Sequence, residues 1–336
     1  MATLAANFPT QLDWAKRLDP QGNIPVIAEL LNQTNEVLSD MTWIEGNLPT
    51  GHQSVVRTGI PTPIFRKFYG GVPATKSTTA QIVDSTCMIE NRSEVDKDLA
   101  DLNGNSDAFR FSEALPIIEG INQAFTTALF YGDSTINPEQ FNGLSPRYSL
   151  TTATNGGNIV NGTGSGSDNA SVWLVVWGPN TISGIFPKAS TAGLKHENLG
   201  IGDAFDAQTP PARYRAYMDH YQWKAGLMVK DWRYAVRIAN IDLSDLAGQT
   251  GTQALTAPTH IVKLMLKAIA RIPSLSMGKP VFYMNRTVKE YLQIHSMDKS
   301  SSAVKLEEAA NQFRESFFGI PIRTVDGLVT ETTAVS

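Results

Sequence analysis

The chain has 336 residues, enough to form one large domain or two modest ones with a sizeable core. Charged residues make up 18% of the chain, below the ~25% of an average soluble domain, and the net charge is -4 without a concentrated basic tract. This balance argues against a protein that reads nucleic-acid sequence, and it suits a protein whose surface is largely covered by other copies of itself.

Residues 1–46 are predicted to form an N-terminal arm, because prolines interrupt the segment and its few apolar residues cannot form a core. One short amphipathic helix is indicated by apolar residues at roughly helical spacing, namely Val26, Leu30, Leu31, Val37 and Leu38. We therefore expect the arm to lie on its own body or on a neighbour.

Residues 47–90 are predicted to form a long two-stranded ribbon. Two segments rich in Val, Ile and Thr, Gln53–Thr62 and Ser77–Glu90, flank a tip that contains prolines and glycines. A lone two-stranded ribbon is marginal in water, so this one needs a partner surface. The residues leave open whether that surface belongs to the same chain or to another copy.

Residues 92–132 are predicted to be helical. Ser93 is a candidate cap for a first short helix, which ends near Gly104. A longer helix is expected from about Ser112 to Tyr131, with Pro116 in its first turn and Gly132 as its stop. One apolar stripe is expected along it, made of Phe111, Leu115, Ile118, Ile121, Phe125 and Leu129.

The rest of the chain mixes strands and helices after a loop-rich stretch over residues 133–170. Strands are predicted at Ser171–Trp177 and within residues 213–241, where apolar and polar residues alternate from Trp232 to Ala239. A helix is expected over residues 258–272 with Thr256 as its cap. The strand Val281–Met284, a helix from Thr287 to His295 capped by Asn285, and a final strand close the chain.

The signatures of common catalytic and binding sites are absent from the sequence. It has no phosphate-binding G-x-x-x-x-G-K-[ST] loop, no G-x-S-x-G elbow and no pair of histidines at metal-binding spacing. The only cysteine, Cys87, lies in a predicted strand and is best explained as a buried apolar filler. We therefore predict no catalytic residue, no cofactor and no metal, and we find no signal peptide or membrane-spanning run.

The order of arm, ribbon, long helix and mixed body resembles the major capsid protein of tailed bacteriophages, in its podovirus-type form. The fold is shared with herpesvirus shells. Local resemblances lie at Ala128–Asp133, Phe141–Leu144, Trp177–Pro179, Gly184–Lys188, Tyr283–Leu292 and Phe318–Arg323. Each motif is weak alone, and their shared order over nearly the whole chain carries the resemblance.

The resemblance implies an α+β capsid fold with an N-terminal arm, an extended β-ribbon loop, a peripheral domain with a long spine helix, and an axial α/β domain. The implied boundaries are an arm at 1–46, a ribbon at 47–90, a peripheral domain at 91–140 and 210–256, an axial domain at 141–209 and 257–325, and a C-terminal tail at 326–336.

The implied function is structural, because members of this family self-assemble into hexamers and pentamers of an icosahedral shell around packaged double-stranded DNA. The implied partners are further copies of the chain, a separate scaffolding protein, a portal protein, a cement or decoration protein, and DNA that lies nearby without specific binding. The expected location is the virion capsid, assembled in the host cytoplasm. Two alternatives stay open, another lattice- or tail-forming phage protein and an enzyme with an unrecognised site.

Charge suggests where the ribbon would contact a neighbour. The proposed intersubunit contacts join basic ribbon residues to acidic positions at the start of the helical region, namely Arg57, Arg66, Lys67 and Lys76 with Glu94, Asp96, Asp98 and Asp101. A solvated charged face is the competing explanation. The proposed hinges, which would let one sequence adopt several curvatures, are Gly59, Gly70, Gly71 and Gly104.

Overall fold

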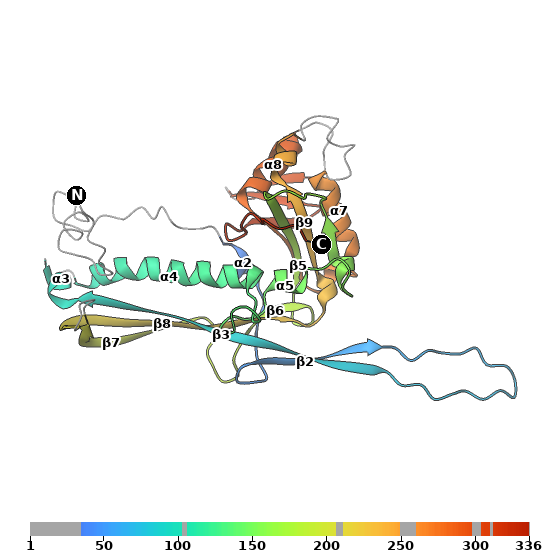
Figure 1. The fold of residues 1–336 in the computed structure, drawn as a ribbon, viewed down its shortest axis with the longest axis horizontal. Helices are drawn as coiled ribbons and strands as arrows, with labels where there is room; N and C mark the ends of the chain where they lie inside the picture. Colours follow the sequence, from blue (N-terminus) through green and yellow to red (C-terminus); the bar gives the residue numbers. More distant parts are fainter. Residues whose placement is uncertain are drawn as a thin grey trace. The chain divides into compact units, whose positions relative to one another are not determined.

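The computed structural model describes residues 35–102, 106–205, 211–248, 260–297, 304–309 and 312–335. These residues form two compact units (Figure 1). Of the described residues, unit 1 contains 88–102, 106–125, 193–205 and 211–224, and unit 2 contains the remainder. The mixture of helices and strands confirms the predicted α+β class. Most of the predicted arm lies outside the described residues.

Unit 1 contains a β-hairpin of strand β7 (Leu194–Phe205) and of strand β8 (Arg213–Val229) up to Lys224. The antiparallel register runs from the pair Leu194 and Trp223 to the pair Phe205 and Arg213. It shifts between Asn198 and Gly200, where the φ of +78° at Gly200 favours a residue without a Cβ. The last part of β3 (Thr78–Asp96) and the short helix α3 (Lys97–Asp101) complete this unit together with most of α4 (Ser106–Tyr131).

Helix α4 runs alongside β3, β7 and β8 in unit 1 (Figure 1). Phe125 stacks on Trp223 of β8, with ring centroids 4.4 Å apart. Arg110 donates from Nη2 to both carboxylate oxygens of Asp219, at 3.0 and 2.9 Å. His196 Nε2 lies 3.0 Å from the same carboxylate. Stacking and a buried ion pair therefore bind the helix to the hairpin.

The start and the apolar face of α4 differ from the prediction. The helix begins at Ser106 rather than Ser112, so Pro116 lies in its interior, and the Ser112 hydroxyl donates to the carbonyl of Phe109 within the helix (2.8 Å). Ile121 and Phe125 are buried as expected, but Phe111, Leu115 and Ile118 are 64%, 41% and 39% exposed. The predicted apolar stripe is therefore buried only in its C-terminal half.

The predicted cap of the first short helix is also wrong. Ser93 is buried within β3, and α3 begins four residues later. Its cap is Asp96, whose carboxylate accepts from the backbone N–H groups of Asp98 and Leu99 at 2.9 and 3.2 Å. Strand β3 continues through Ser93 to Asp96, so its extended backbone overrides the local capping signal of Ser93.

Unit 2 is built around a sheet in which β5 (Asn169–Trp177) is central and buried along its whole length. It pairs antiparallel with β9 (Ala235–Asp242) and with β10 (Lys279–Met284). Beyond these lie further strands, namely β1 (Trp43–Glu45), β2 (Gly51–Gly59), β4 (Ile159–Asn161), β6 (Ile182–Phe186), β11 (Val304–Ala309), β12 (Gln312–Phe317) and β13 (Ile320–Thr324). In the strand order β11-β12-β13-β10-β5-β6, β5 lies in the interior of the sheet, between β10 and β6.

Helices and aromatic rings cover the two faces of this sheet. The helices of unit 2 are α2 (Val37–Asp40), α5 (Leu144–Arg147), α6 (Leu243–Gly248), α7 (Ile261–Arg271) and α8 (Arg286–Met297), with single turns at Gly156–Asn158, Trp232–Tyr234 and Leu275–Met277. Buried residues of α7 and α8 share one hydrophobic cluster with β5 and β9. Phe130, Tyr148 and Tyr283 form ring contacts with Trp173 or Trp177 of β5.

Two terminal segments are fixed to unit 2 through buried charges. The Asp40 carboxylate accepts from Lys279 Nζ at 2.7 Å and from Arg323 Nε at 3.1 Å, and this pairing joins α2 to β10 and β13. Near the C-terminus, Glu331 pairs with Arg237 at 2.7 Å. The segment from about Asp326, predicted as a tail, thus contributes to the packed body, and Leu328 is buried.

Several boundary predictions in unit 2 can be checked. Gly132 ends α4 and Asn285 caps α8 through Val288 N (2.8 Å), so both predictions are confirmed. The alternation expected from Trp232 is wrong, because Trp232–Tyr234 is a single helical turn and Arg237 is buried. His260, not Thr256, caps α7; Thr256 lies outside the described residues.

Among the described residues, no helix combines the length and apolarity needed to cross a membrane.

Candidate assembly surfaces

The predicted ribbon is present and belongs to unit 2 up to Cys87. Strands β2 and β3 pair antiparallel from Gly51 with Ser85 to Gly59 with Thr78, and the register is irregular between Arg57 and Gly59 (Figure 1). The two strands read as alternating Val, Ile, Thr and polar residues, which favours extended backbone. The ribbon offers an edge and a long loop for contact with another molecule.

The base of the ribbon is held by one buried acid. Asp84 is 2% exposed, and its carboxylate accepts from Arg147 Nη2 at 2.7 Å and from the backbone N–H of Val229 at 3.1 Å. Gly51 allows the strands to approach closely, since a Cβ there would lie 2.1 Å from the carbonyl oxygen of Asp84. The ribbon therefore leaves unit 2 from a fixed base.

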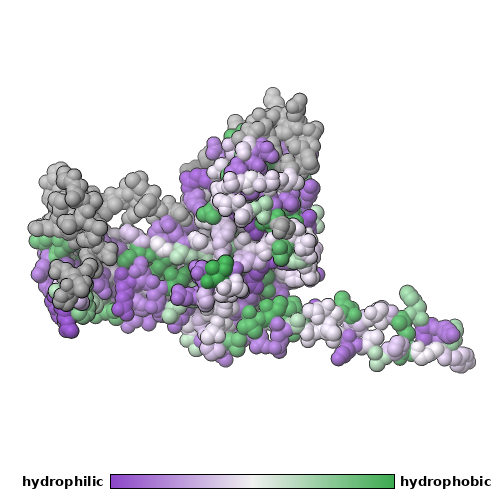
Figure 2. All heavy atoms as spheres, viewed as in Figure 1, coloured by the Kyte–Doolittle hydropathy of each residue, from purple (hydrophilic) through white to green (hydrophobic). Residues whose placement is uncertain are grey.

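The loop of residues 60–77, called here the ribbon tip, exposes large apolar side chains. Phe65, Phe68 and Tyr69 are at least 91% exposed. A turn from Lys67 to Gly70, closed by Gly70 N and Lys67 O at 3.1 Å, holds Tyr69 at a φ of +62°. Figure 2 shows hydrophobic residues along this loop. Contiguous exposed apolar surface of this kind marks an interaction site.

The predicted basic contact residues all lie on the ribbon and point to solvent. Arg57 is exposed on β2, while Arg66, Lys67 and Lys76 are exposed in the ribbon tip. Between Gly46 and Val83 the sequence contains no acidic residue. The stretch from Gly46 to Val83, which includes the ribbon tip, is therefore a positive part of an otherwise mildly acidic chain.

The predicted acidic contact residues lie in unit 1, and two of them are engaged there. Asp96 caps α3, and Asp101 pairs with Lys97 at 2.7 Å and accepts from the Tyr217 hydroxyl at 3.1 Å. The Lys97 hydrogen bond lowers the pKa of Asp101. Glu94 is partly exposed at the end of β3, and Asp98 is exposed on α3. The structure thus shows local roles for half of the predicted acceptors.

The proposed hinge glycines occupy different settings. Gly59 lies at the irregular register of the ribbon, where a Cβ would lie 2.4 Å from the Thr78 hydroxyl. Gly70 closes the Lys67 turn, and Gly71 has open space around the position of a Cβ. Gly104 lies outside the described residues. Their role as hinges stays a prediction.

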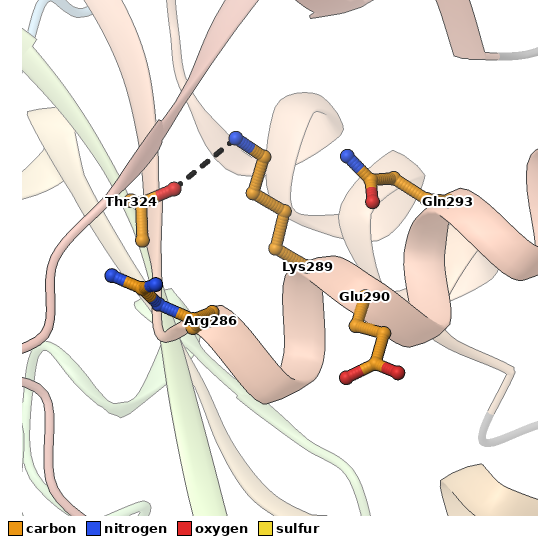
Figure 3. A pocket seen from close by; sticks show the side chains of 5 residues that line it. All are labelled: Arg286, Lys289, Glu290, Gln293 and Thr324. Carbon is orange, nitrogen blue, oxygen red and sulfur yellow. Dashed lines mark hydrogen bonds between the residues drawn. The ribbon is translucent and has the colours of Figure 1, made fainter.

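A shallow pocket of about 360 Å³ lies between α8 and β13 in unit 2 (Figure 3). Its lining is polar and consists of Arg286, Lys289, Glu290, Gln293 and Thr324. Asp326 pairs with Arg286 at 2.9 Å, and Glu315 lies 3.6 Å from Lys289. Because Asp326 and Glu315 lie beside Arg286 and Lys289, the positive charge of the pocket is largely neutralised.

Reactive groups are scarce in the part of the chain that the structure describes. No three His, Cys, Asp or Glu side chains of the described ranges gather as a metal site would require. Cys87 is buried as predicted, and burial raises the pKa of its thiol to about 11. This thiol is poorly suited to nucleophilic chemistry at neutral pH.

Sequence reasoning missed the aromatic residues of the ribbon tip and the anchor Asp84. The available signal was the presence of Phe65, Phe68 and Tyr69 within five positions of a segment rich in Pro and Gly. For Asp84, the signal was an acid within a strand segment of Val, Ile and Thr residues, because such an acid is buried only with a partner.

Comparisons with known proteins agree on one family. The family described as major capsid protein GP7 matches residues 19–336. A chain in the near-atomic cryo-EM structure of bacteriophage Epsilon15 is 30% identical with a TM-score of 0.77, covering 100% of this chain and 99% of that chain.

More distant similarities are weaker. A chain of the bacteriophage JBD30 capsid is 10% identical with a TM-score of 0.46, and 97% of each chain is covered. A chain of the native GTA particle capsid is 11% identical with a TM-score of 0.43, covering 67% of this chain and 95% of that chain. No curated protein sequence matches the chain.

Proposed function

The chain belongs to the major capsid protein GP7 family and is a structural protein that forms a capsid shell, and we propose that it does so as hexamers and pentamers of an icosahedral shell around double-stranded DNA. Members of this family are structural subunits rather than enzymes, which decides against the enzyme alternative. The fold expected from the resemblance, that of a tailed-phage capsid protein, is shown by the same comparisons.

The observation that carries the proposal is the exposed, apolar and positively charged ribbon tip. In an isolated subunit its aromatic side chains are in water, and covering each ring would remove about 150–250 Å² of surface from solvent. A subunit that repeats this contact around a ring covers the tip of every copy. The exposed tip thus supports self-association as the role of the ribbon.

The finer assignments are part of the same proposal. We infer that the basic ribbon residues contact acidic residues of a neighbour. The partly exposed Glu94 and the exposed Asp98 are the favoured acceptors, because the other two predicted acids already have roles within unit 1. The domain boundaries stated above, the scaffolding, portal and decoration partners, and assembly in the host cytoplasm follow from the family resemblance. The location in the virion capsid follows from the family itself.

The test is expression of the chain followed by sizing chromatography and negative-stain electron microscopy. Closed shells or six-fold capsomers are expected from the unaltered chain. Arg66→Glu with Lys67→Glu should reduce particle yield at least tenfold while leaving circular dichroism and the thermal transition of the subunit unchanged, because both side chains are fully on the surface.

The matched control is Lys188→Glu with Lys267→Glu, which changes the net charge equally at exposed positions of unit 2 outside the ribbon. This control should assemble as the unaltered chain does. Equal particle yields from the ribbon variant and the unaltered chain would contradict the proposal.

A further inference from the structure

Two acidic side chains of unit 2 lie together where β5 begins and β9 ends. Asp168 immediately precedes β5, and Asp242 is the last residue of β9. The Ser244 hydroxyl lies 2.7 Å from Asp168 Oδ2 and 2.8 Å from Asp242 Oδ1. A hydroxyl has only one proton to donate, so the two carboxylates share a single side-chain donor.

The charge of this pair is not balanced by a basic side chain in the ranges that the structure describes, where neither acid forms an ion pair. Asp242 Oδ1 caps α6 by accepting from the backbone N–H groups of Ser244 and Asp245 at 3.0 and 3.1 Å. The hydrogen bond from the Ser244 hydroxyl lowers the pKa of Asp242, so this carboxylate is ionised at neutral pH. Within the same ranges, Asp242 Oδ2 and Asp168 Oδ1 have no donor.

A third oxygen, that of the Asn169 side chain, is buried beside the pair. Asn169 is 0% exposed, and its Oδ1 has no hydrogen-bond partner among the described residues. Its Nδ2 donates to the carbonyl of Gly166 at 2.6 Å, which fixes the direction of the amide. Asn169 lies opposite Asp242 in the register of β5 and β9, so both side chains leave the sheet on the same face. A buried oxygen of this kind is costly unless a donor or a cation meets it.

Gly164 marks the point where the oxygens converge. A Cβ at this position would lie 2.5 Å from Asn169 Oδ1 and 3.1 Å from Asp242 Cβ. It would also lie 2.8 Å from the backbone carbonyl oxygen of Asn240. That carbonyl accepts from Gly164 N at 2.9 Å and retains a second lone pair. The amide oxygen therefore points to the same place as the acid on the neighbouring strand.

Gly166 allows the same close approach on the side of the carboxylates. A Cβ there would lie 2.8 Å from Asp168 Oδ1 and 3.7 Å from Asp242 Oδ2. These are the two carboxylate oxygens that have no donor among the described residues. Carboxylate, amide and backbone carbonyl oxygens are the ligands that Ca²⁺ takes in proteins, with water completing its shell.

We propose that Asp168, Asp242 and the Asn169 side chain form a binding site for a divalent cation, and that calcium is the ion that fits it. The site has two carboxylates rather than three, and the amide and backbone oxygens that supplement them favour Ca²⁺ over Mg²⁺, which retains more of its water. The site departs from the expectation of no metal, because its acids come from segments far apart in the sequence.

The site lies where the C-terminal segment is attached to unit 2. The backbone of Asn169 exchanges two hydrogen bonds with Glu331, at 2.7 and 3.2 Å. The side-chain amide of Asn240 exchanges two more with the backbone of Val335, at 2.9 and 2.8 Å. A cation bound at this point holds the ends of β5 and β9 together, so it stabilises the subunit and the attachment of this segment.

The test is equilibrium dialysis of the full-length chain against radioactive calcium chloride after treatment with EDTA. One calcium ion per chain is expected, with a dissociation constant on the order of 10⁻⁴–10⁻³ M, because both carboxylates are partly exposed. Asp168→Asn with Asp242→Asn should weaken binding at least tenfold. Asparagine caps a helix about as well as aspartate, so α6 is retained in this double variant.

Thermal unfolding gives a second readout of the same site. Calcium chloride at about 10 mM should raise the Tm of the unaltered chain by about 2–4 °C beyond the effect of sodium chloride at equal ionic strength. The double variant should show no such rise. Absence of calcium binding by the unaltered chain, or equal binding by the double variant, would overturn the proposal.

The matched control is Glu139→Gln with Glu290→Gln, which removes two charges from exposed acids of unit 2. This control should bind calcium as the unaltered chain does, and an equal loss of binding in both double variants would attribute the effect to surface charge and overturn the proposal.

Asp168→Asn alone tests the site without any change in the cap of α6. It should weaken calcium binding at least threefold, and unchanged affinity would remove Asp168 from the site and overturn the proposal. None of these measurements depends on whether the chain forms shells.

Discussion

Buried charged side chains join distant parts of this chain. Asp84 fixes the base of the ribbon, Asp40 fixes α2 to β10 and β13, and Arg237 fixes the C-terminal segment through Glu331. Each pair joins residues at least 63 positions apart in the sequence. Removal of one partner is costly because the other charge is left in a site of low polarity. These residues therefore specify how the segments are attached.

Asp84→Asn should destabilise the subunit. The change removes the negative charge that Arg147 meets at 2.7 Å and weakens the contact with Val229 N. We expect the free energy of unfolding to fall by about 3 kcal/mol, the lower end for a broken buried pair, because Arg147 is partly exposed. Urea unfolding of the unassembled subunit measures this change.

Asp326→Asn is the matched control for Asp84→Asn. It breaks the pair with Arg286 at 2.9 Å, in which the arginine is largely exposed. Solvent screens this pair, so we expect a much smaller loss than from Asp84→Asn. Equal losses from the two substitutions would contradict the assignment of Asp84 as an anchor.

Cys87 should resist thiol reagents in the folded protein. Burial raises the pKa of its thiol from 9.0 to about 11. At pH 8 the ratio of thiolate to thiol is therefore about 100-fold lower than for an exposed cysteine. Labelling by a maleimide should be slow in native buffer and fast in urea. Fast labelling of the native subunit would place the side chain at the surface.

The same shift predicts a loss of stability in alkali. As the pH rises above about 9, the thiol of the unfolded chain ionises while the folded thiol stays neutral until about 11. The unfolded state is therefore favoured in this window, and the free energy of unfolding should fall by up to about 2–3 kcal/mol. Comparison with Cys87→Ala over the same pH range isolates this contribution.

At the scale of single elements, the ribbon has two different faces. In the antiparallel register, Val55 lies opposite Gln81 and its face is exposed, whereas Ser54 lies opposite Ile82 on the more buried face. Opposed residues share a face, so one side of the ribbon is left available to a neighbour. The element is thus suited to lie flat on another subunit.

Helix α4 offers a test of its own through two glycines. Gly120 lies within the helix with open space around the position of a Cβ, so Gly120→Ala should stabilise the subunit by about 0.5–1 kcal/mol through helix propensity. Gly132 follows the helix, and a Cβ there would lie 2.5 Å from the carbonyl oxygen of Ala128. Gly132→Ala should therefore destabilise the subunit.

Thermal unfolding of the two glycine variants beside the unaltered subunit is the measurement, and opposite shifts of Tm are expected. If both substitutions raise Tm, the helix does not end where the structure places it. If both lower Tm, the position of Gly120 is not open to solvent.

At the scale of the whole molecule, a shell subunit must fold alone and still expose surfaces that can contact other subunits. The hydrophobic cluster of unit 2 supplies a core that does not involve the ribbon tip. Assembly then depends on contacts that symmetry repeats around the shell. Folding and assembly should therefore respond separately to changes in the tip.

Replacement of residues 60–77 by Asn-Gly should separate the two processes. A two-residue turn can join Gly59 to Thr78, which pair at the end of the ribbon. The free energy of unfolding should rise by up to about 2 kcal/mol, because closing the longer loop costs more chain entropy than closing a two-residue turn. Sedimentation should show free subunits where the unaltered chain forms particles; particles from the shortened chain would contradict a role of the tip in assembly.

Much of the fold follows from local patterns. The ribbon, the long helix, a strand at Ser171–Trp177, the stop at Gly132 and the cap at Asn285 were predicted because each depends on periodicity or on capping by one side chain. The start of α4, the cap of α3 and the helical turn at Trp232–Tyr234 were mispredicted. In those places tertiary packing and the continuation of a strand outweigh the local signal.

The sequence by itself determined the order of elements and the positive charge around the ribbon tip, because hydrophobic periodicity, turn residues and charge are properties of neighbouring residues. The family was indicated by a resemblance, which the comparisons confirm. Only the tertiary structure decided which half of the α4 stripe is covered, which acids are already paired, and that Asp84, Asp40 and Glu331 hold the segments together. Burial and pairing depend on residues far apart in the chain, and a linear pattern does not contain their distances.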